Sequence, residues 1–147
     1  MNCYDKALSL LARIEHCRRG LHVKLAARGY EESDIEAALD RLSDEGHLDD
    51  RRYAELWIEF RMKRTREGRR LLLAGLVRRG VDRETADAAV RRASLSDAYA
   101  AALEQAYHQI RSQGVSSRRE IVSRLLRRGY GPGEVAAYLE NIDADFD

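Results

Sequence analysis

Arginine is the residue type in this sequence whose number and spacing could do chemistry. Only three of the 26 basic residues are lysines, and 13 of the 26 lie between residues 51 and 100, where there are seven acidic residues. Within residues 61–79 the only acidic residue is Glu67. A planar guanidinium group binds carboxylate or phosphate through two hydrogen bonds, although GC-rich coding would produce the same arginine bias. Such a patch attracts a polyanion, either nucleic acid or an acidic protein surface, and the net charge of +1 conceals it.

Three arginine pairs each fall in the first turn of a predicted helix: Arg18-Arg19, Arg69-Arg70 and Arg118-Arg119. The helix dipole disfavours a cation there by about 0.3–1 kcal/mol. An anion bound at the helix N-terminus would explain the recurrence. Pairing with acidic neighbours such as Glu67 or Glu15 would explain it equally well. The second pair favours anion binding, because further basic residues precede it in the sequence.

The other reactive side chains show no catalytic or metal-binding pattern. The four histidines form no i, i+4 pair, and no glycine motif typical of nucleotide binding is present. Cys17 follows His16 directly, which could suggest a nucleophile and its base. Adjacent residues on a helix point in different directions, so the two side chains are not expected to act together. Acidic residues cluster around predicted helix starts, where capping explains them. We therefore expect a protein that is not an enzyme and has no cofactor and no metal.

The elements that position the arginines come from an internal repeat. Three segments end in Arg-Gly, and their glycines, Gly29, Gly80 and Gly129, are 51 and 49 residues apart. Apolar residues recur eight and four positions before each glycine, and six, eight and ten positions after it. These residues are Leu21, Leu72 and Ile121; Leu25, Leu76 and Leu125; Ile35, Ala86 and Val135; Ala37, Ala88 and Ala137; and Leu39, Val90 and Leu139. Residues four apart share a helix face, so each unit has two amphipathic helices that turn at a left-handed glycine.

A further helix precedes each pair, at about residues 5–15, 50–62 and 96–112. In the second of these, four large apolar residues recur at i, i+3, i+4 and i+7 and are expected to be buried: Tyr53, Leu56, Trp57 and Phe60. Asp82 and Ser117 are predicted N-caps, the latter in a capping box with Glu120, and Pro132 suits the first helical position.

The predicted fold is all-α, with three tandem three-helix repeats at residues 1–48, 49–95 and 96–147. Each repeat covers apolar faces of its neighbour, which gives an elongated curved array. No segment approaches the ~20 apolar residues of a membrane span. Cys3 and Cys17 belong to no larger cysteine framework and indicate free thiols in a reducing, cytoplasmic compartment.

Several of these segments resemble the RecX family. Leu21-x-x-Lys24-Leu25-x-x-Arg28-Gly29-Tyr30 fits its first repeat. Gly46-His47-Leu48-Asp49-Asp50-Arg51-Arg52-Tyr53-Ala54 is similar to its most recognisable motif, with His47 in place of an aromatic residue. Residues 61–80 resemble its basic second-repeat segment. The resemblance is strong over residues 7–90 and continues in register to about residue 140.

The resemblance also exposes one departure. The family usually has Ser where Cys17 stands and Glu where Gly20 stands, which together make a capping box. Without that box we expect the following helix to be less well fixed, by ~1 kcal/mol.

The resemblance implies a monomeric regulatory protein whose partner is the RecA filament. By analogy it binds in the groove of the RecA–DNA filament and inhibits recombinase, ATPase and coprotease activity, which modulates recombination, DNA repair and the SOS response. Contact with DNA is expected to be weak and nonspecific. The alternative is a stand-alone helix-turn-helix DNA-binding protein without a RecA partner. Against it, the predicted recognition helices at 32–45, 82–93 and 132–142 hold few residues that read base edges.

The predicted partner-binding residues are the basic residues of the second repeat and their counterparts in the third. They are Arg61, Lys63, Arg64, Arg66, Arg69, Arg70, Arg78, Arg118, Arg119 and Arg127.

Overall fold

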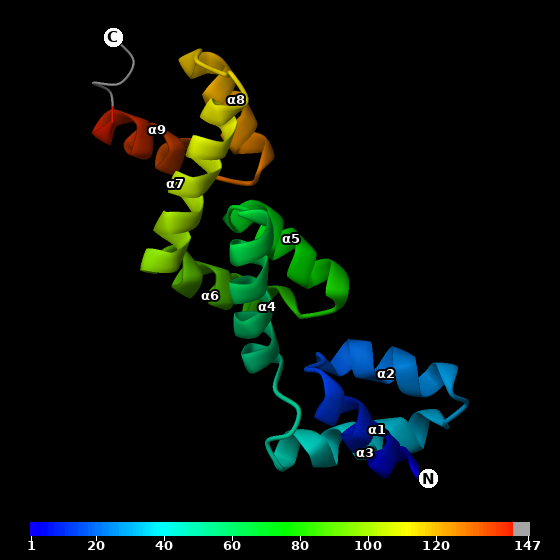
Figure 1. Ribbon diagram of the computed structural model, residues 1–147. Helices are drawn as coiled ribbons and strands as arrows, with labels where there is room; N and C mark the ends of the chain where they lie inside the picture. The colour runs from blue at the N-terminus through cyan, green and yellow to red at the C-terminus, as the bar shows by residue number, and fades with distance from the viewer. Residues whose placement is uncertain (143–147) are drawn as a thin grey trace. The chain divides into compact units, whose positions relative to one another are not determined.

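Helices account for all the regular structure in residues 1–142, the part of the chain that the computed structural model describes (Figure 1). Nine helices and no strand occur there, which confirms the all-α prediction for these residues. The helices are α1 (Cys3–Arg13), α2 (Arg18–Ala27), α3 (Glu32–Asp44), α4 (Asp50–Thr65), α5 (Arg69–Arg79), α6 (Arg83–Ser94), α7 (Asp97–Ser112), α8 (Arg118–Arg127) and α9 (Pro132–Asn141). Among them none has both the length and the apolar character of a membrane-crossing helix.

The chain divides into two compact units, and α4, α5 and α6 each contribute to both. Unit 1 contains Met1–Leu56 and Gly75–Ala89. Unit 2 contains Trp57–Ala74 and the described residues from Val90 onward. Each predicted repeat holds three consecutive helices, but the repeat boundaries do not coincide with those of the units. The division into three domains and the curvature of the array remain predictions.

The core of unit 1 lies between α1, α2 and α3, which pack against one another (Figure 1). Leu21 and Leu25 of α2 are fully buried against Ile35, Leu39 and Leu42 of α3. Their spacing of three or four residues is the helical periodicity that the sequence shows.

In unit 2, α8 packs against both α7 and α9. The repeat positions eight and four before the glycine, and six and ten after it, are buried in all three copies. The position eight after the glycine is not, since Ala37 and Ala137 are exposed. On a helix, the eighth residue after the glycine points about 200° away from the sixth. One helix face therefore cannot bury both residues.

Glycines and caps mark the helix ends as predicted. Gly29, Gly80 and Gly129 have φ of +88°, +104° and +100°, the left-handed region that glycine favours. The Asp82 carboxylate accepts a hydrogen bond from the Thr85 N–H at 3.1 Å. Ser117 caps α8 by accepting from the Glu120 N–H. The Glu120 carboxylate pairs with Arg124 instead of the Ser117 N–H, so only half of the predicted capping box forms. Pro132 occupies the first turn of α9.

The predicted buried stripe on α4 is wrong. Leu56 is 46% exposed and Phe60 is 55% exposed, while Tyr53 and Trp57 are only half-buried. The buried side chains of α4 are instead Ala54, Ile58 and Met62, four residues apart. This helix has apolar residues on two adjacent faces, and it buries the face with the smaller side chains.

Helix α2 begins at Arg18 although its capping residue is a cysteine. The Cys17 thiol occupies the N-cap position and accepts a weak hydrogen bond from the Gly20 N–H at 3.4 Å. The Asp50 carboxylate adds a stronger acceptor, which binds the Arg18 N–H at 2.7 Å. The adjacent Asp49 caps α4 by accepting from the Arg51 N–H at 3.0 Å. The two aspartates therefore cap different helices, so the start of α2 is better fixed than the loss of the capping box suggests.

Replacing Asp50 with alanine is expected to lower the free energy of unfolding by about 1–2 kcal/mol, because α2 loses its charged cap. Asp50→Asn should cost less than half as much. Burial raises the pKa of the Asp50 carboxyl, so the charge is disfavoured there, and asparagine keeps the acceptor oxygen without the charge. Urea unfolding measures both variants. Asp44→Ala, at the exposed C-terminal end of α3, is the control, and an equal loss there would contradict the capping role.

His16 is buried between α1 and α2 and is neutral. Its Nδ1–H donates to the Ile14 carbonyl at 2.8 Å, and its Nε2 accepts from the Lys24 ammonium at 2.7 Å. Burial and the Lys24 charge lower the pKa of His16. The folded protein therefore binds this proton less tightly than the unfolded chain, so the contribution of neutral His16 to stability is present above about pH 6.5 and is lost as the pH falls through the lower folded value.

We expect the free energy of unfolding to fall between pH 7.5 and pH 5.5, and to fall less in His16→Gln. Urea unfolding at the two pH values measures the difference. The exposed His47, changed to glutamine, is the control and should leave the pH dependence unchanged. The same pH dependence in His16→Gln as in the unmodified protein would show that another group causes it.

Candidate functional site

The site begins with a close approach between the α4–α5 loop and the turn after α8. The Gly68 N–H donates to the Arg128 carbonyl at 2.7 Å, and the Arg70 N–H donates to the Gly129 carbonyl at 3.1 Å. A Cβ added at Gly68 would lie 2.4 Å from the backbone nitrogen of Tyr130. Only glycine allows this contact, which fixes the start of α5 against the end of α8.

Two buried tyrosines form hydrogen bonds to the backbone of the α4–α5 loop and the start of α5. The Tyr130 hydroxyl donates to the Arg66 carbonyl at 2.8 Å. The Tyr99 hydroxyl accepts from the Arg69 N–H at 3.0 Å and donates to Glu134 at 3.0 Å. Burial raises the pKa of both phenols, so both remain protonated and able to donate. Their rings pack edge to face, with centroids 5.7 Å apart.

An open groove of about 730 Å³ lies between α5 and α8. Apolar side chains and three arginines line it, together with Ser123 and Gly129. The apolar side chains are Leu71, Ala74, Val122 and Leu126, and the arginines are Arg70, Arg119 and Arg127. Among residues 1–142, no acidic residue lines the groove.

The three groove arginines are the predicted site residues that unit 2 brings together. Their side chains form no hydrogen bond or ion pair within residues 1–142. Unpaired guanidinium groups gathered around one groove are available to a partner. Arg70 and Arg119 come from matching pairs in different repeats. Anion binding by these two residues stays a prediction.

Most of the other predicted residues already have partners. Arg61 pairs with Glu67 at 2.5 Å, and the Arg66 side chain donates to Gln105 at 3.1 Å. Lys63 pairs with Glu59 at 3.3 Å on α4. Arg69 lies 3.9 Å from the Glu134 carboxylate.

The last three predicted residues are exposed, and Arg118 also makes a contact of its own within the described chain. Arg64 lies over the Phe60 ring on α4, with its guanidinium carbon 5.7 Å from the ring centroid. Arg118 is exposed at the start of α8, and Arg78 is exposed near the end of α5, within unit 1. None of the three lines the groove.

The sequence did not predict the aromatic surface on α4. The Arg64 guanidinium lies over the ring of the exposed Phe60. The guanidinium carbon of Arg61 lies 5.5 Å from the ring centroid of the half-buried Trp57. Stacked cations of this kind contribute about 0.5–1 kcal/mol at exposed sites. Each arginine follows its aromatic ring by four residues, and this spacing is the signal that could have revealed the pairs.

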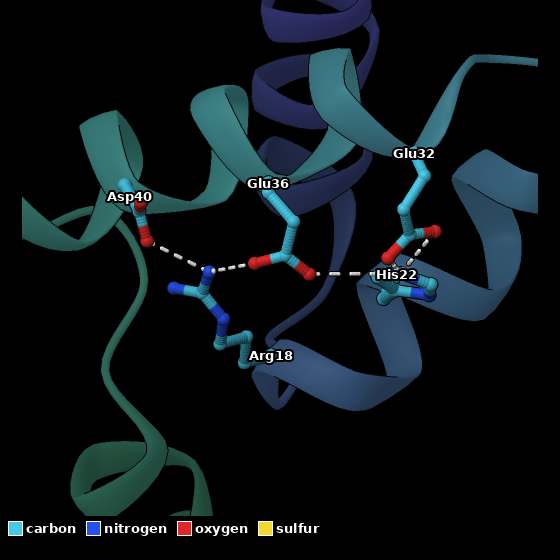
Figure 2. A network of polar contacts seen from close by, with 5 residues as sticks. All are labelled: Arg18, His22, Glu32, Glu36 and Asp40. Carbon is cyan, nitrogen blue, oxygen red and sulfur yellow. Dashed lines mark hydrogen bonds and ion pairs between the residues drawn. The ribbon is translucent and has the colours of Figure 1, made fainter.

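In unit 1 one member of the first arginine pair, Arg18, forms ion pairs within the fold. Arg18 donates from one nitrogen to Glu36 at 2.8 Å and to Asp40 at 2.7 Å, both on α3 (Figure 2). The ion-pair interpretation is therefore confirmed for Arg18, although its partners are not the predicted Glu15.

A second contact on the same helices joins His22 to two carboxylates. Its Nε2 lies 2.9 Å from Glu32 and 3.7 Å from Glu36 (Figure 2). Ligand atoms of these three residues lie within 4.8 Å of one another, close enough for a metal ion. Sequence spacing alone could not bring His22 of α2 to the glutamates of α3. In the structure these atoms bind one another and Arg18, so the cluster is an ion-pair network that fastens α2 to α3.

Cys17 is not placed as an activated nucleophile. Its thiol donates to the Arg79 carbonyl at 3.3 Å, and burial raises its pKa. A reactive cysteine needs the opposite shift. The neighbouring His16 bonds to Ile14 and Lys24.

Comparison with known proteins decides the family. The model of the first three-helix domain of RecX matches residues 3–42, and that of the second matches residues 49–90. Together they cover more than half of the chain. The chain belongs to the RecX family. A Halorhodospira halophila protein named Regulatory protein RecX is 34% identical over 144 residues, which cover 96% of this chain and 88% of that protein.

Other RecX proteins extend the comparison. The Thermus thermophilus protein named Regulatory protein RecX is 45% identical over 94 residues, and the match spans 64% of each chain. The crystal structure of RecX from Lactobacillus salivarius has a TM-score of 0.84 at 20% identity and covers 97% of this chain and 95% of its own. That likeness shows that the RecX fold extends through the third repeat, beyond the two matched domains.

Proposed function

We propose that this RecX-family protein is a regulator that binds RecA filaments and inhibits their recombinase, ATPase and coprotease activities. The groove between α5 and α8 supports the proposal, because its three unpaired arginines would bind an anionic partner. Family membership supports the choice of partner, since relatives are named Regulatory protein RecX. We further propose that the protein acts as a monomer in the cytoplasm, without a cofactor and not as an enzyme, and that any contact with DNA is weak and nonspecific.

The alternative, a stand-alone helix-turn-helix protein, finds less support in unit 1. Helix α3, which would read bases there, carries Glu32, Glu36 and Asp40 in the ion-pair network with α2. A carboxylate-rich helix repels the phosphate backbone. This arrangement favours docking on a protein filament over reading a DNA groove.

DNA-dependent ATP hydrolysis by RecA tests the proposal. Substoichiometric amounts of this protein should lower the hydrolysis rate and shorten the filaments seen by electron microscopy. If both the rate and the filament length are unchanged at low salt, the proposed function is wrong. Sequence-specific binding to free duplex DNA at physiological salt would favour the alternative.

A further inference from the structure

We infer that the α5–α8 groove binds an acidic protein segment that carries apolar side chains, and not the DNA backbone. The inference rests on the proposed function, because it names the part of the filament that this groove contacts. Four features of the groove support it: its charge, its apolar lining, the spacing of its arginines and its rigidity.

The positive charge of the groove favours an anionic ligand. Arg70, Arg119 and Arg127 line one groove without an acidic lining residue and without a partner among the described residues. The acidic residue nearest in sequence to Arg70 is Glu67, which pairs with Arg61, and the one nearest to Arg119 is Glu120, which pairs with Arg124. Like charges gathered in this way repel each other, and an acidic ligand removes that repulsion.

The apolar lining distinguishes between the two kinds of anionic partner. Leu71, Ala74, Val122 and Leu126 make up four of the nine lining residues, and Leu71 is 37% exposed. Protein–DNA interfaces are polar and strongly charged, because phosphates and sugars offer little apolar surface to bury. A peptide segment supplies both carboxylates for the arginines and apolar side chains for the leucines.

The spacing of the arginines sets the length of the segment. Arg119 and Arg127 are eight residues apart on α8, or about 12 Å along the helix axis. About four residues of extended peptide span that distance. The fitting segment therefore has two carboxylates separated by a short apolar stretch, with Arg70 of α5 facing them across the groove.

The groove is also pre-formed, which lowers the entropy lost on binding. Its two helices are joined by the Gly68 and Arg70 backbone hydrogen bonds and by the contact of Gly129 with Leu71. The partner segment can therefore bind without a rearrangement of the groove.

Photo-crosslinking from inside the groove tests the inference. Benzoylphenylalanine is placed at Ser123, an exposed lining residue, and the protein is irradiated with RecA filaments assembled on single-stranded DNA. We expect crosslinks to a RecA peptide containing acidic and apolar residues. The same probe at Ala101, exposed on α7 and outside the groove, should not crosslink to that peptide.

A second variant separates the apolar contribution from the charge. Leu126→Gln should weaken binding to RecA filaments at least fivefold in a titration at 150 mM salt, with circular dichroism and melting temperature confirming the fold. Three outcomes would overturn the inference but leave the proposed function standing. The probe crosslinks to DNA alone, Leu126→Gln binds RecA filaments as tightly as the unmodified protein, or the probe-bearing protein still inhibits RecA but gives no crosslink. No inhibition by the unmodified protein would overturn both.

Discussion

Reversing the charge of Arg70 and Arg119 together is expected to weaken the inhibition of RecA at least tenfold, or by about 1.4 kcal/mol or more of binding free energy. Both side chains line the α5–α8 groove and have no partner within the described residues. Their replacement by glutamate therefore removes no side-chain hydrogen bond or ion pair among the described residues, and the helical circular dichroism should not change. The concentration that halves RecA ATP hydrolysis measures the effect.

A charge-matched control separates the groove from general electrostatics. Arg13→Glu with Arg83→Glu changes the net charge by the same amount at exposed positions in unit 1. Since long-range attraction depends on total charge, an equal loss of inhibition in the control would show that the groove has no special role. Unchanged inhibition by the groove variant would remove these two arginines from the binding site.

The helices could be predicted from the sequence because local signals agree at each end. Gly29, Gly80 and Gly129 end their helices in the left-handed conformation, and Asp82 and Ser117 cap helices as expected. These features depend on backbone conformation and on contacts within a few residues. No long-range information is needed to find them.

Burial on α4 could not be predicted in the same way. The stripe containing Trp57 and Phe60 has the right period, and so does the neighbouring stripe of Ala54, Ile58 and Met62. Periodicity identifies an apolar face, but it does not decide which of two adjacent faces packs inside. Side-chain size suggested the aromatic face, whereas the structure buries the smaller residues.

The lining of the candidate groove could be predicted only in part, for a similar reason. Local charge density selected ten basic residues, and three of them line the groove. Some of the other predicted residues already have acidic partners, such as Glu67 for Arg61 and Glu134 near Arg69. Charge density along the sequence does not reveal these partners. The lining of the groove depends also on the docking of α5 on α8, which brings Arg70 across from residues about 50 positions later in the chain.

That docking makes Gly68→Ala the substitution with the largest expected effect on stability. A Cβ at this position would meet the Tyr130 nitrogen at 2.4 Å and the Gly129 carbonyl carbon at 2.5 Å, and both are backbone atoms that cannot rotate away. The α4–α5 loop must then move off the turn after α8. We expect the free energy of unfolding to fall by about 2–3 kcal/mol, as measured by urea unfolding.

Inhibition of RecA should fall with stability in this variant, because Arg70 moves away from Arg119 when the Gly68 and Arg70 backbone hydrogen bonds are lost. Gly133→Ala is the matched control: nothing lies within 4 Å of an added Cβ there, and its φ is not positive. Since Gly133 lies in α9, alanine should stabilise the helix by up to about 1 kcal/mol and leave inhibition unchanged. A Gly68→Ala protein as stable as the unmodified one would mean that the loop does not rest on this turn, and the groove between α5 and α8 would lose the contact that forms it.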